Sequence, residues 1–154
     1  MSNSDTGLQF QRSNLIVRDL DRSLAIYRDI LGFSIDYQKV SEKTSYSYTV
    51  FGIPAHAKLR FCTLSAPGQL RTLALTEVTG IELPEAPSTP RLSALVLKVD
   101  AMDAVLKAFV ARGDMLLHPE QVLHTQDGRV GREIGVVDPD GHLLVLYTIT
   151  RAGG

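Results

Sequence analysis

The sequence has a single cysteine, no long apolar run and almost no excess of charge of either sign. Cys62 has no second cysteine to pair with, so no intrachain disulfide can form and a reducing, cytoplasmic setting is predicted. No apolar stretch approaches the roughly 18 residues that a membrane-spanning helix needs, and the first residues lack the pattern of a secretory signal. The net charge of −1 gives no reason to expect nucleic acid or an anionic membrane as a partner.

Alternating and helical apolar patterns predict two similar halves. Helices are predicted after Asp19 and from Asp103, and Gly32 and Gly113 end them. The segment 41–54 is predicted to be a short helix or irregular. The predicted strands are 10–17, 33–40, 59–64 and 71–78 in the first half, and 92–99, 115–117, 122–125, 131–137 and 143–149 in the second.

The two halves form modules over residues 9–80 and 92–150, joined by a proline-containing linker at 81–91. A shift of 82 positions superposes Val17 on Val99 and Tyr27 on Phe109, which indicates an internal duplication. Each module has a sheet with a helix on one face, and its other face also needs cover. The sequence therefore predicts an α+β protein, in which two βαβββ repeats form a curled mixed sheet around a central cup.

Several segments in this order resemble the vicinal oxygen chelate superfamily, which includes glyoxalase I, bleomycin-resistance proteins and extradiol dioxygenases. The resemblance implies the paired βαβββ fold, a small-molecule ligand and a homodimer. The segments are LIVRDLDRSLAIYRDILGF (15–33), FGIPAHAKLRF (51–61), RTLALTEV (71–78), SALVLKVDAMDAVL (93–106) and VVDPDGHLLVLY (136–147).

In metal-dependent members of that superfamily, four positions in the cup present His or Glu to a divalent ion. The resemblance places Arg12, Ala74, Ala94 and Val145 at these positions. Alanine and valine have no donor atoms, and arginine is a permanent cation. Because a divalent ion needs several converging donors, neither a metal nor another cofactor is expected.

Strand alternation then gives the expected lining of the cup. A largely apolar wall with one cation suits a hydrophobic or aromatic organic molecule whose anionic or carbonyl head meets the arginine. Tyr48 lies where superfamily members often have a flap, and its ring is expected to stack on a planar ligand. The other predicted ligand-binding residues are Arg12, Asn14, Thr72, Ala74, Ala94 and Val145.

Whether the chain is an enzyme is left open by its sequence. The first hypothesis is a metal-independent binding protein. The alternative is a cofactor-free lyase, isomerase or cyclase acting on an aromatic or polyketide-like substrate, with His118 or His124 moving the proton. A third hypothesis is a metal-dependent lyase of the glyoxalase I type, or a dioxygenase, with rearranged ligands. If the alignment with the superfamily pattern were shifted by two residues, Asn14 and Glu77 would become candidate metal ligands, but no pair of histidines would.

Overall fold

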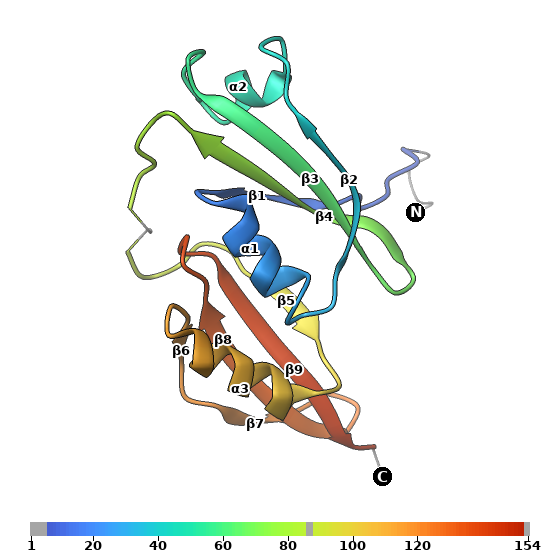
Figure 1. The fold of residues 1–154 in the computed structure, drawn as a ribbon. Coiled ribbons are helices and arrows are strands. Elements are labelled where there is room, and N and C mark those ends of the chain that lie inside the picture. The colour runs from blue at the N-terminus through green and yellow to red at the C-terminus, as the bar shows by residue number, and fades with distance from the viewer. Residues whose placement is uncertain (1–5, 86–87, 153–154) are drawn as a thin grey trace. The chain divides into compact units, whose positions relative to one another are not determined.

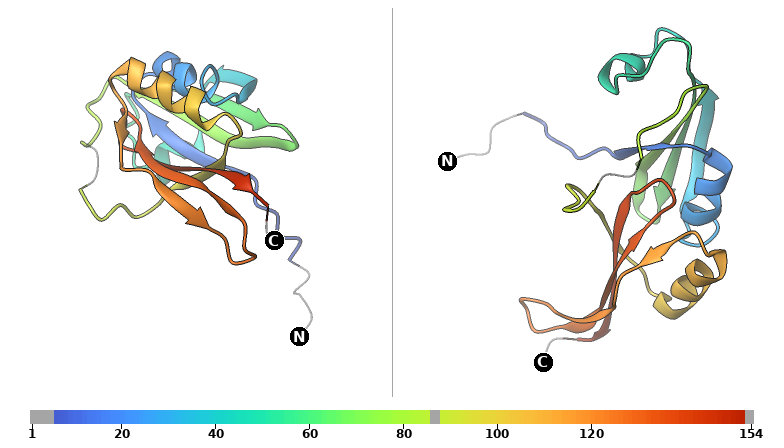
Figure 2. Two further views of the ribbon diagram at one scale, coloured as in Figure 1. Left: turned by 90° about the horizontal axis from the view of Figure 1, so that it is seen from below. Right: turned by 90° about the vertical axis from the view of Figure 1, so that its left-hand side faces the viewer.

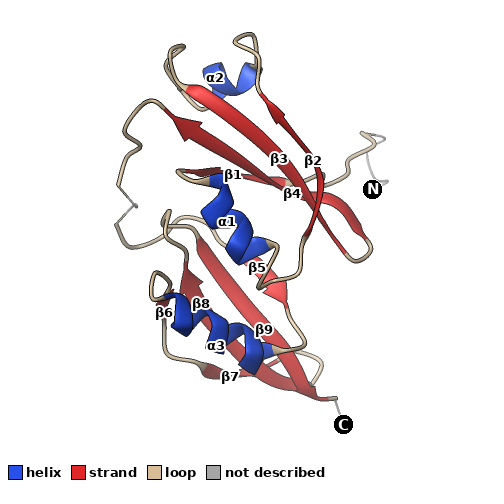
Figure 3. Cartoon of the chain, in the orientation of Figure 1, coloured by secondary structure: helices blue, strands red, loops and turns tan. Residues whose placement is uncertain are grey.

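The computed structural model describes residues 6–85 and 88–152, so residues 86 and 87 of the predicted linker lie outside the described part. Strands outnumber helices, which confirms the α+β prediction (Figure 3). The chain divides into two compact units (Figure 1). The first comprises the chain up to Ser23 together with Gly32–Ile81, and the second comprises Leu24–Leu31 together with the chain from Glu82 onward.

The first unit contains a four-stranded sheet in the order β1-β4-β3-β2. β1 runs parallel to β4, and the other neighbouring strands are antiparallel. The elements are β1 (Ser13–Val17), α1 (Leu20–Tyr27, whose end belongs to the second unit), β2 (Ser34–Val40), α2 (Tyr46–Val50), β3 (Lys58–Ala66) and β4 (Gln69–Thr79).

The second unit contains a sheet in the order β5-β9-β8-β6, with β7 also paired to β8. α3 lies on one face of this sheet (Figure 2). The elements are β5 (Leu95–Lys98), α3 (Met102–Arg112), β6 (Leu116–Leu117), β7 (Gln121–His124), β8 (Val130–Val137) and β9 (Leu143–Arg151).

Strand pairing confirms the internal repeat. Asn14 pairs with Ala74 in the first unit, and Val96 pairs with Val145 in the second. Because Asn14 and Val96 are 82 positions apart, the shift found in the sequence joins residues with the same place in their sheets. Each unit has a parallel pair between its first and last strands, so both are βαβββ modules, and β7 is an addition to the second.

Two strands begin three residues later than the sequence predicted. The first strand begins at Ser13, and the backbone of Arg71 near its partner on β4 has a positive φ of 51°, which interrupts the extended conformation there. The predicted strand 92–99 is reduced to Leu95–Lys98. Its partner β9 begins only at Leu143, directly after the 138–141 turn, so the preceding Leu92 is 95% exposed.

Buried polar contacts fix the start of α1. The Leu20 amide donates to Glu77 Oε2 at 2.7 Å, and the Arg22 amide donates to Asp19 Oδ1 at 3.0 Å, so two free amides of the first turn are satisfied. Arg60 donates to both oxygens of Glu77, at 2.8 and 2.9 Å. The hydrogen bonds from Arg60 lower the pKa of the Glu77 carboxyl, although burial opposes this shift.

α3 packs through Met102, Val105 and Phe109, which lie on one stripe of the helix and are all buried. Val110 is 66% exposed, because it lies one residue beyond the stripe. Gly113 ends the helix with a φ of 78°, in the left-handed conformation predicted for this stop. No helix of the described chain is long and apolar enough to cross a membrane.

The 138–141 turn of the second unit is built around the Asp138 carboxylate. Asp138 Oδ1 accepts from the amides of Asp140 and His142, at 3.0 and 2.9 Å. Asp138 Oδ2 accepts from the hydroxyl of Tyr27 at 2.9 Å. Burial raises the pKa of both Asp138 and Tyr27. The aspartate at the start of the DPDG motif therefore joins the end of α1 to the strand that follows the turn.

Candidate functional site

Strand alternation gives the first unit's sheet two different faces. Cys62 and Glu77 point to the face on which α1 begins, and Cys62 is fully buried. Asn14, Ala74 and Thr63 lie side by side on β1, β4 and β3 and point to the opposite face, away from α1. The sequence-predicted contacts on these strands therefore share the face away from α1.

One cross-strand row on this face, here called the polar row, consists of Asn14, Ala74, Thr63 and Tyr37. Asn14 Oδ1 accepts a hydrogen bond from Thr76 Oγ1 at 2.8 Å. This bond fixes the amide orientation and leaves the Asn14 Nδ2 group as a donor on the face. The small side chain of Ala74 lies between two polar neighbours.

Thr63 has a buried hydroxyl with unused hydrogen-bonding capacity. The residue is 1% exposed, and no group in the described part of the chain hydrogen-bonds its Oγ1. A buried polar atom without a partner costs about 1–3 kcal/mol, and such atoms are uncommon in folded proteins. Thr63 was missed from the sequence, because only the strand register places it beside Ala74.

An aromatic pair flanks the polar row. The rings of Tyr37 and Phe61 lie 6.0 Å apart between centroids and are tilted by 57°. Phe61 is half-buried and pairs with Thr76 across β3 and β4. The face away from α1 therefore carries both hydrogen-bonding groups and an aromatic pair, and its central residues Thr63 and Ala74 are buried.

Arg12 lies one residue before β1 and is exposed. Its Nε donates to the Arg71 carbonyl at 3.3 Å, and its Nη1 and Nη2 have no partner among the described residues. The guanidinium of Arg71 is occupied, because Nε contacts Asp36 Oδ2 at 2.6 Å. Thr72, the remaining predicted contact on β4, is half-buried.

Tyr48 lies on α2, in the segment where a flap was predicted. It is buried, and its hydroxyl donates to the Ala57 carbonyl at 2.7 Å. Lys43 Nζ also donates to that carbonyl at 2.8 Å and lies 5.3 Å from the centre of the Tyr48 ring. These contacts attach α2 to the start of β3, so the Tyr48 hydroxyl already has a structural partner.

The corresponding row of the second unit consists of Val96, Val145, Gly135 and His118. The His118 amide donates to the Gly135 carbonyl at 2.9 Å. The His118 ring also covers this glycine, since a Cβ on Gly135 would lie 3.1 Å from His118 Cδ2. Ala94 precedes β5 and is exposed.

A pocket of about 230 Å³ lies on the face of the second unit's sheet that points away from α3 (Figure 2). The main polar group is Glu133, which pairs with Tyr147 on β9 and with Gln121 on β7. Gln121 Nε2 donates to Glu133 Oε1 at 3.1 Å. The lining residues are Pro119, Gln121, Glu133, Ile134, Gly135 and Val145. Val145 is thus the one predicted site residue that lines this pocket.

Ion pairs on the opposite face hold the wall of the pocket in place. Arg132 Nη2 lies 2.8 Å from both Glu120 Oε1 and Asp103 Oδ1, so it joins the segment after His118 to α3. Glu120 and Arg132 are the chain neighbours of Gln121 and Glu133. These ion pairs therefore restrain the backbone next to Gln121 and Glu133 from the opposite face of the sheet.

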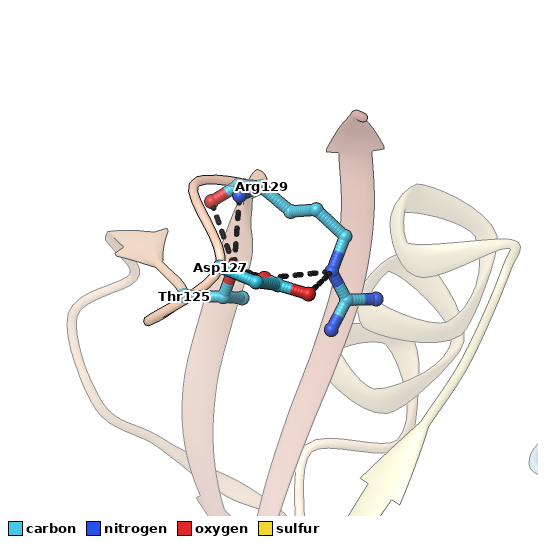
Figure 4. A network of polar contacts seen from close by, with 3 residues as sticks. All are labelled: Thr125, Asp127 and Arg129. Atoms are coloured by element: carbon cyan, nitrogen blue, oxygen red, sulfur yellow. Dashed lines mark hydrogen bonds and ion pairs between the residues drawn. The ribbon is translucent and has the colours of Figure 1, made fainter. Parts of the chain in front are cut away.

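His124 lies elsewhere, at the end of β7, where it pairs with Val130. The hairpin beyond it has its own polar network (Figure 4). Thr125 Oγ1 donates to Asp127 and accepts from the Arg129 amide at 2.9 Å, while Arg129 Nε contacts both oxygens of Asp127 at 3.0 Å. This hairpin also lines a pocket of about 400 Å³, through Thr125, Gln126, Asp127 and Arg129. Both candidate histidines therefore precede a pocket-lining residue, but only His118 lies near a carboxylate without an ion-pair partner among the described residues.

The donor atoms on these faces do not suit the divalent metal that the resemblance to metal-dependent proteins would imply. The polar row offers only neutral amide and hydroxyl oxygens, and Val145 and its neighbours Val96 and Gly135 have no donor side chains. Imidazole, thiolate and carboxylate are the usual ligands of divalent transition metals. Within the described residues, no three His, Cys, Asp or Glu side chains are grouped to hold an ion.

Each of the two βαβββ modules contains a mixed sheet whose first and last strands run parallel. The chain belongs to the Glyoxalase/Bleomycin resistance protein/Dioxygenase superfamily, whose profile matches residues 9–146. A search of curated proteins found no match.

Solved structures support the same fold. A glyoxalase family protein from Bacillus cereus is 14% identical, with a TM-score of 0.73 and coverage of 97% of this chain and 98% of that one. A glyoxylase/bleomycin resistance protein/dioxygenase domain from Frankia sp. EAN1pec is 23% identical, with a TM-score of 0.63 and coverage of 100% and 96%. A mutant of the fosfomycin resistance protein FosX from Listeria monocytogenes, complexed with Mn(II) and 1S,2S-dihydroxypropylphosphonic acid, is 22% identical, with a TM-score of 0.60 and coverage of 98% and 95%.

Proposed function

We propose that this chain is a metal-independent binding protein for a small, largely hydrophobic or aromatic molecule with an anionic or carbonyl head. Arg12 and Asn14 supply hydrogen-bond donors for the head, and the Tyr37–Phe61 pair supplies a surface for the body of the ligand. The acid bound by the Listeria relative also has an anionic head. That relative holds Mn(II), whereas the present polar row offers only neutral oxygens.

The unsatisfied hydroxyl of Thr63 is the observation that carries this proposal. It is buried beside Ala74, in the same row as Asn14, where a hydrogen bond from the chain would be expected but none is made by the described residues. A ligand head placed at Ala74 would supply the missing partner. Binding would then remove the free-energy cost that the unpaired Thr63 hydroxyl imposes on the folded chain without ligand.

Replacing Thr63 by valine tests this proposal, because the two side chains have the same shape. The T63V variant is expected to be at least as stable as the original chain, since an unpaired hydroxyl is removed. It is also expected to bind aromatic carboxylates, with benzoate and 1-naphthoate as probes, at least tenfold more weakly. Urea denaturation measures the stability, and isothermal titration calorimetry measures the affinity.

Thr44→Val is the matched control, because Thr44 is exposed, and it should change neither quantity. Equal benzoate binding by T63V and the original chain would remove Thr63 from the site, and no binding by any probe would count against the proposal itself. Stoichiometric zinc, iron, nickel or manganese in the purified protein would contradict metal independence. The homodimer and the cytoplasmic setting stay predictions.

A second candidate is the cofactor-free lyase or isomerase, favoured by the position of His118 over Gly135 beside a pocket that contains a carboxylate. An acid–base histidine should remove an α-proton from a bound aromatic ketone and return a deuteron from D₂O. Acetophenone should then exchange its methyl hydrogens faster with the protein than without it. His118→Asn should abolish the acceleration and His124→Asn should preserve it, as followed by proton NMR. Exchange at the buffer rate would remove this candidate.

A further inference from the structure

We propose that the pocket of the second unit binds the ammonium group of a small primary amine through Glu133. This inference goes beyond the proposed function, which concerns an anionic or carbonyl head on the first unit. It rests on the charge of Glu133, the size of the pocket and the way its walls are held.

Glu133 is a half-buried carboxylate without a cationic partner among the described residues. Its one hydrogen bond comes from the neutral amide of Gln121, which leaves Oε2 open to a further donor. Lys98 points to the same face on the far side of Tyr147, but its Nζ contacts Asp100 at 3.0 Å. A carboxylate accepts hydrogen bonds only, so it favours a ligand that brings donors and a positive charge.

The remaining lining fits an apolar body attached to that charge. Pro119 and Val145 provide apolar walls, and Gly135 has no side chain that would fill the pocket. At about 230 Å³ the pocket is smaller than the roughly 300–1,000 Å³ of sites for drug-sized ligands. It therefore suits a molecule with one ring rather than a larger one.

The Glu133 carboxylate is also held before a ligand arrives. Gln121 fixes one of its oxygens, and the Arg132–Glu120 ion pair on the other face fixes the backbone on both sides of the contact. A carboxylate with few remaining rotamers loses less entropy when it binds a cation. An exposed carboxylate on a loop would lack this advantage.

A titration of the full ¹⁵N-labelled chain, followed by amide chemical shifts, tests this site with three ligands of similar shape. Benzylammonium is expected to shift the Gly135 and Gln121 amides in a saturable way, with roughly millimolar affinity. Benzyl alcohol should bind at least tenfold more weakly at these residues, because it has no charge. Glu133→Gln should weaken benzylammonium binding at least tenfold, whereas Glu42→Gln, at an exposed carboxylate, should leave it unchanged.

Equal binding of the amine and the alcohol would overturn the inference, as would equal binding by the E133Q variant. The comparison of ligands on the unmodified chain does not depend on how any variant folds, and the amide spectrum of E133Q reports its fold directly. Benzoate, the third ligand, should act through Thr63 and be insensitive to E133Q. Failure of this site and failure of the proposed function are therefore distinguishable.

Discussion

Gly131→Ala is expected to destabilise the protein by roughly 3 kcal/mol or to prevent its folding. Gly131 lies on β8 next to an irregularity in the pairing with β9. A Cβ at this position would lie 2.0 Å from the carbonyl oxygen of Thr148 and 3.2 Å from the Cα of Ile149. These are backbone atoms, so the clash can be relieved only by moving two paired strands apart. Chemical denaturation of the variant measures the loss.

Gly135→Ala, four residues along the same strand, is the matched control. Its Cβ would meet the His118 ring at 3.1 Å, and a side chain of that kind can move by a few tenths of an ångström. The stability of G135A should stay within about 1 kcal/mol of the original chain. Equal losses at the two glycines would show that a general cost of alanine in this strand, and not the contact with Thr148, is responsible.

Glu77→Gln is expected to lower the free energy of unfolding by about 2 kcal/mol at pH 7. The side chain of Glu77 is 9% exposed, and it accepts hydrogen bonds from Arg60 and from the first amide of α1. Removing one partner of a buried ion pair costs about 3–5 kcal/mol when the other partner is also buried. The value expected here is smaller because the Arg60 side chain is 40% exposed and water can solvate it.

The effect of Glu77→Gln should shrink in acid, and the direction of the pKa shift gives the reason. The hydrogen bonds from Arg60 lower the pKa of Glu77 in the folded chain below its ordinary value of 4.5. The stability that Glu77 contributes is therefore complete above pH 4.5 and is lost as the pH falls through the lower, folded-state pKa. Asp138 acts in the opposite sense because burial raises its pKa, so the comparison must be a difference between Glu77→Gln and the original chain at each pH.

Denaturation midpoints at pH 7 and at several values below pH 4.5 provide that comparison. Glu42→Gln serves as the control, since Glu42 is exposed. A loss of stability that stays constant down to pH 3 would contradict the ionic contribution of Glu77 and would leave only packing as its role.

The sequence was sufficient for the elements and their order, because periodicity and glycine stops are local signals. The repeat was visible for the same reason: residues such as Tyr27 and Phe109 fill equivalent core positions, and both are fully buried. The ends of the strands were less accurate. Whether residues 92–94 or 10–12 pair depends on where the partner strand begins, and that partner is distant in the sequence.

The residues of the candidate site were also predictable only in part. Alternation along β1 and β4 correctly put Asn14 and Ala74 on one face, since that period is a property of each strand. Thr63 and Glu133 were not found, because both were single polar residues in strands whose register was unknown. The stacking of the Tyr48 ring on a ligand stays a prediction, and the structure adds that its hydroxyl donates to the Ala57 carbonyl, a contact that depends on how α2 turns back onto β3.

By itself, the sequence determined the α+β class, the duplicated βαβββ order and the lack of metal-donor residues at Ala74 and Val145. Only the tertiary structure decided what surrounds those two positions. Register across non-adjacent strands places Thr63 beside Ala74, and Gly135 with the His118 ring beside Val145. The physical reason is that side-chain direction repeats every two residues along a strand, whereas the neighbours of a side chain are set by hydrogen bonds to other strands.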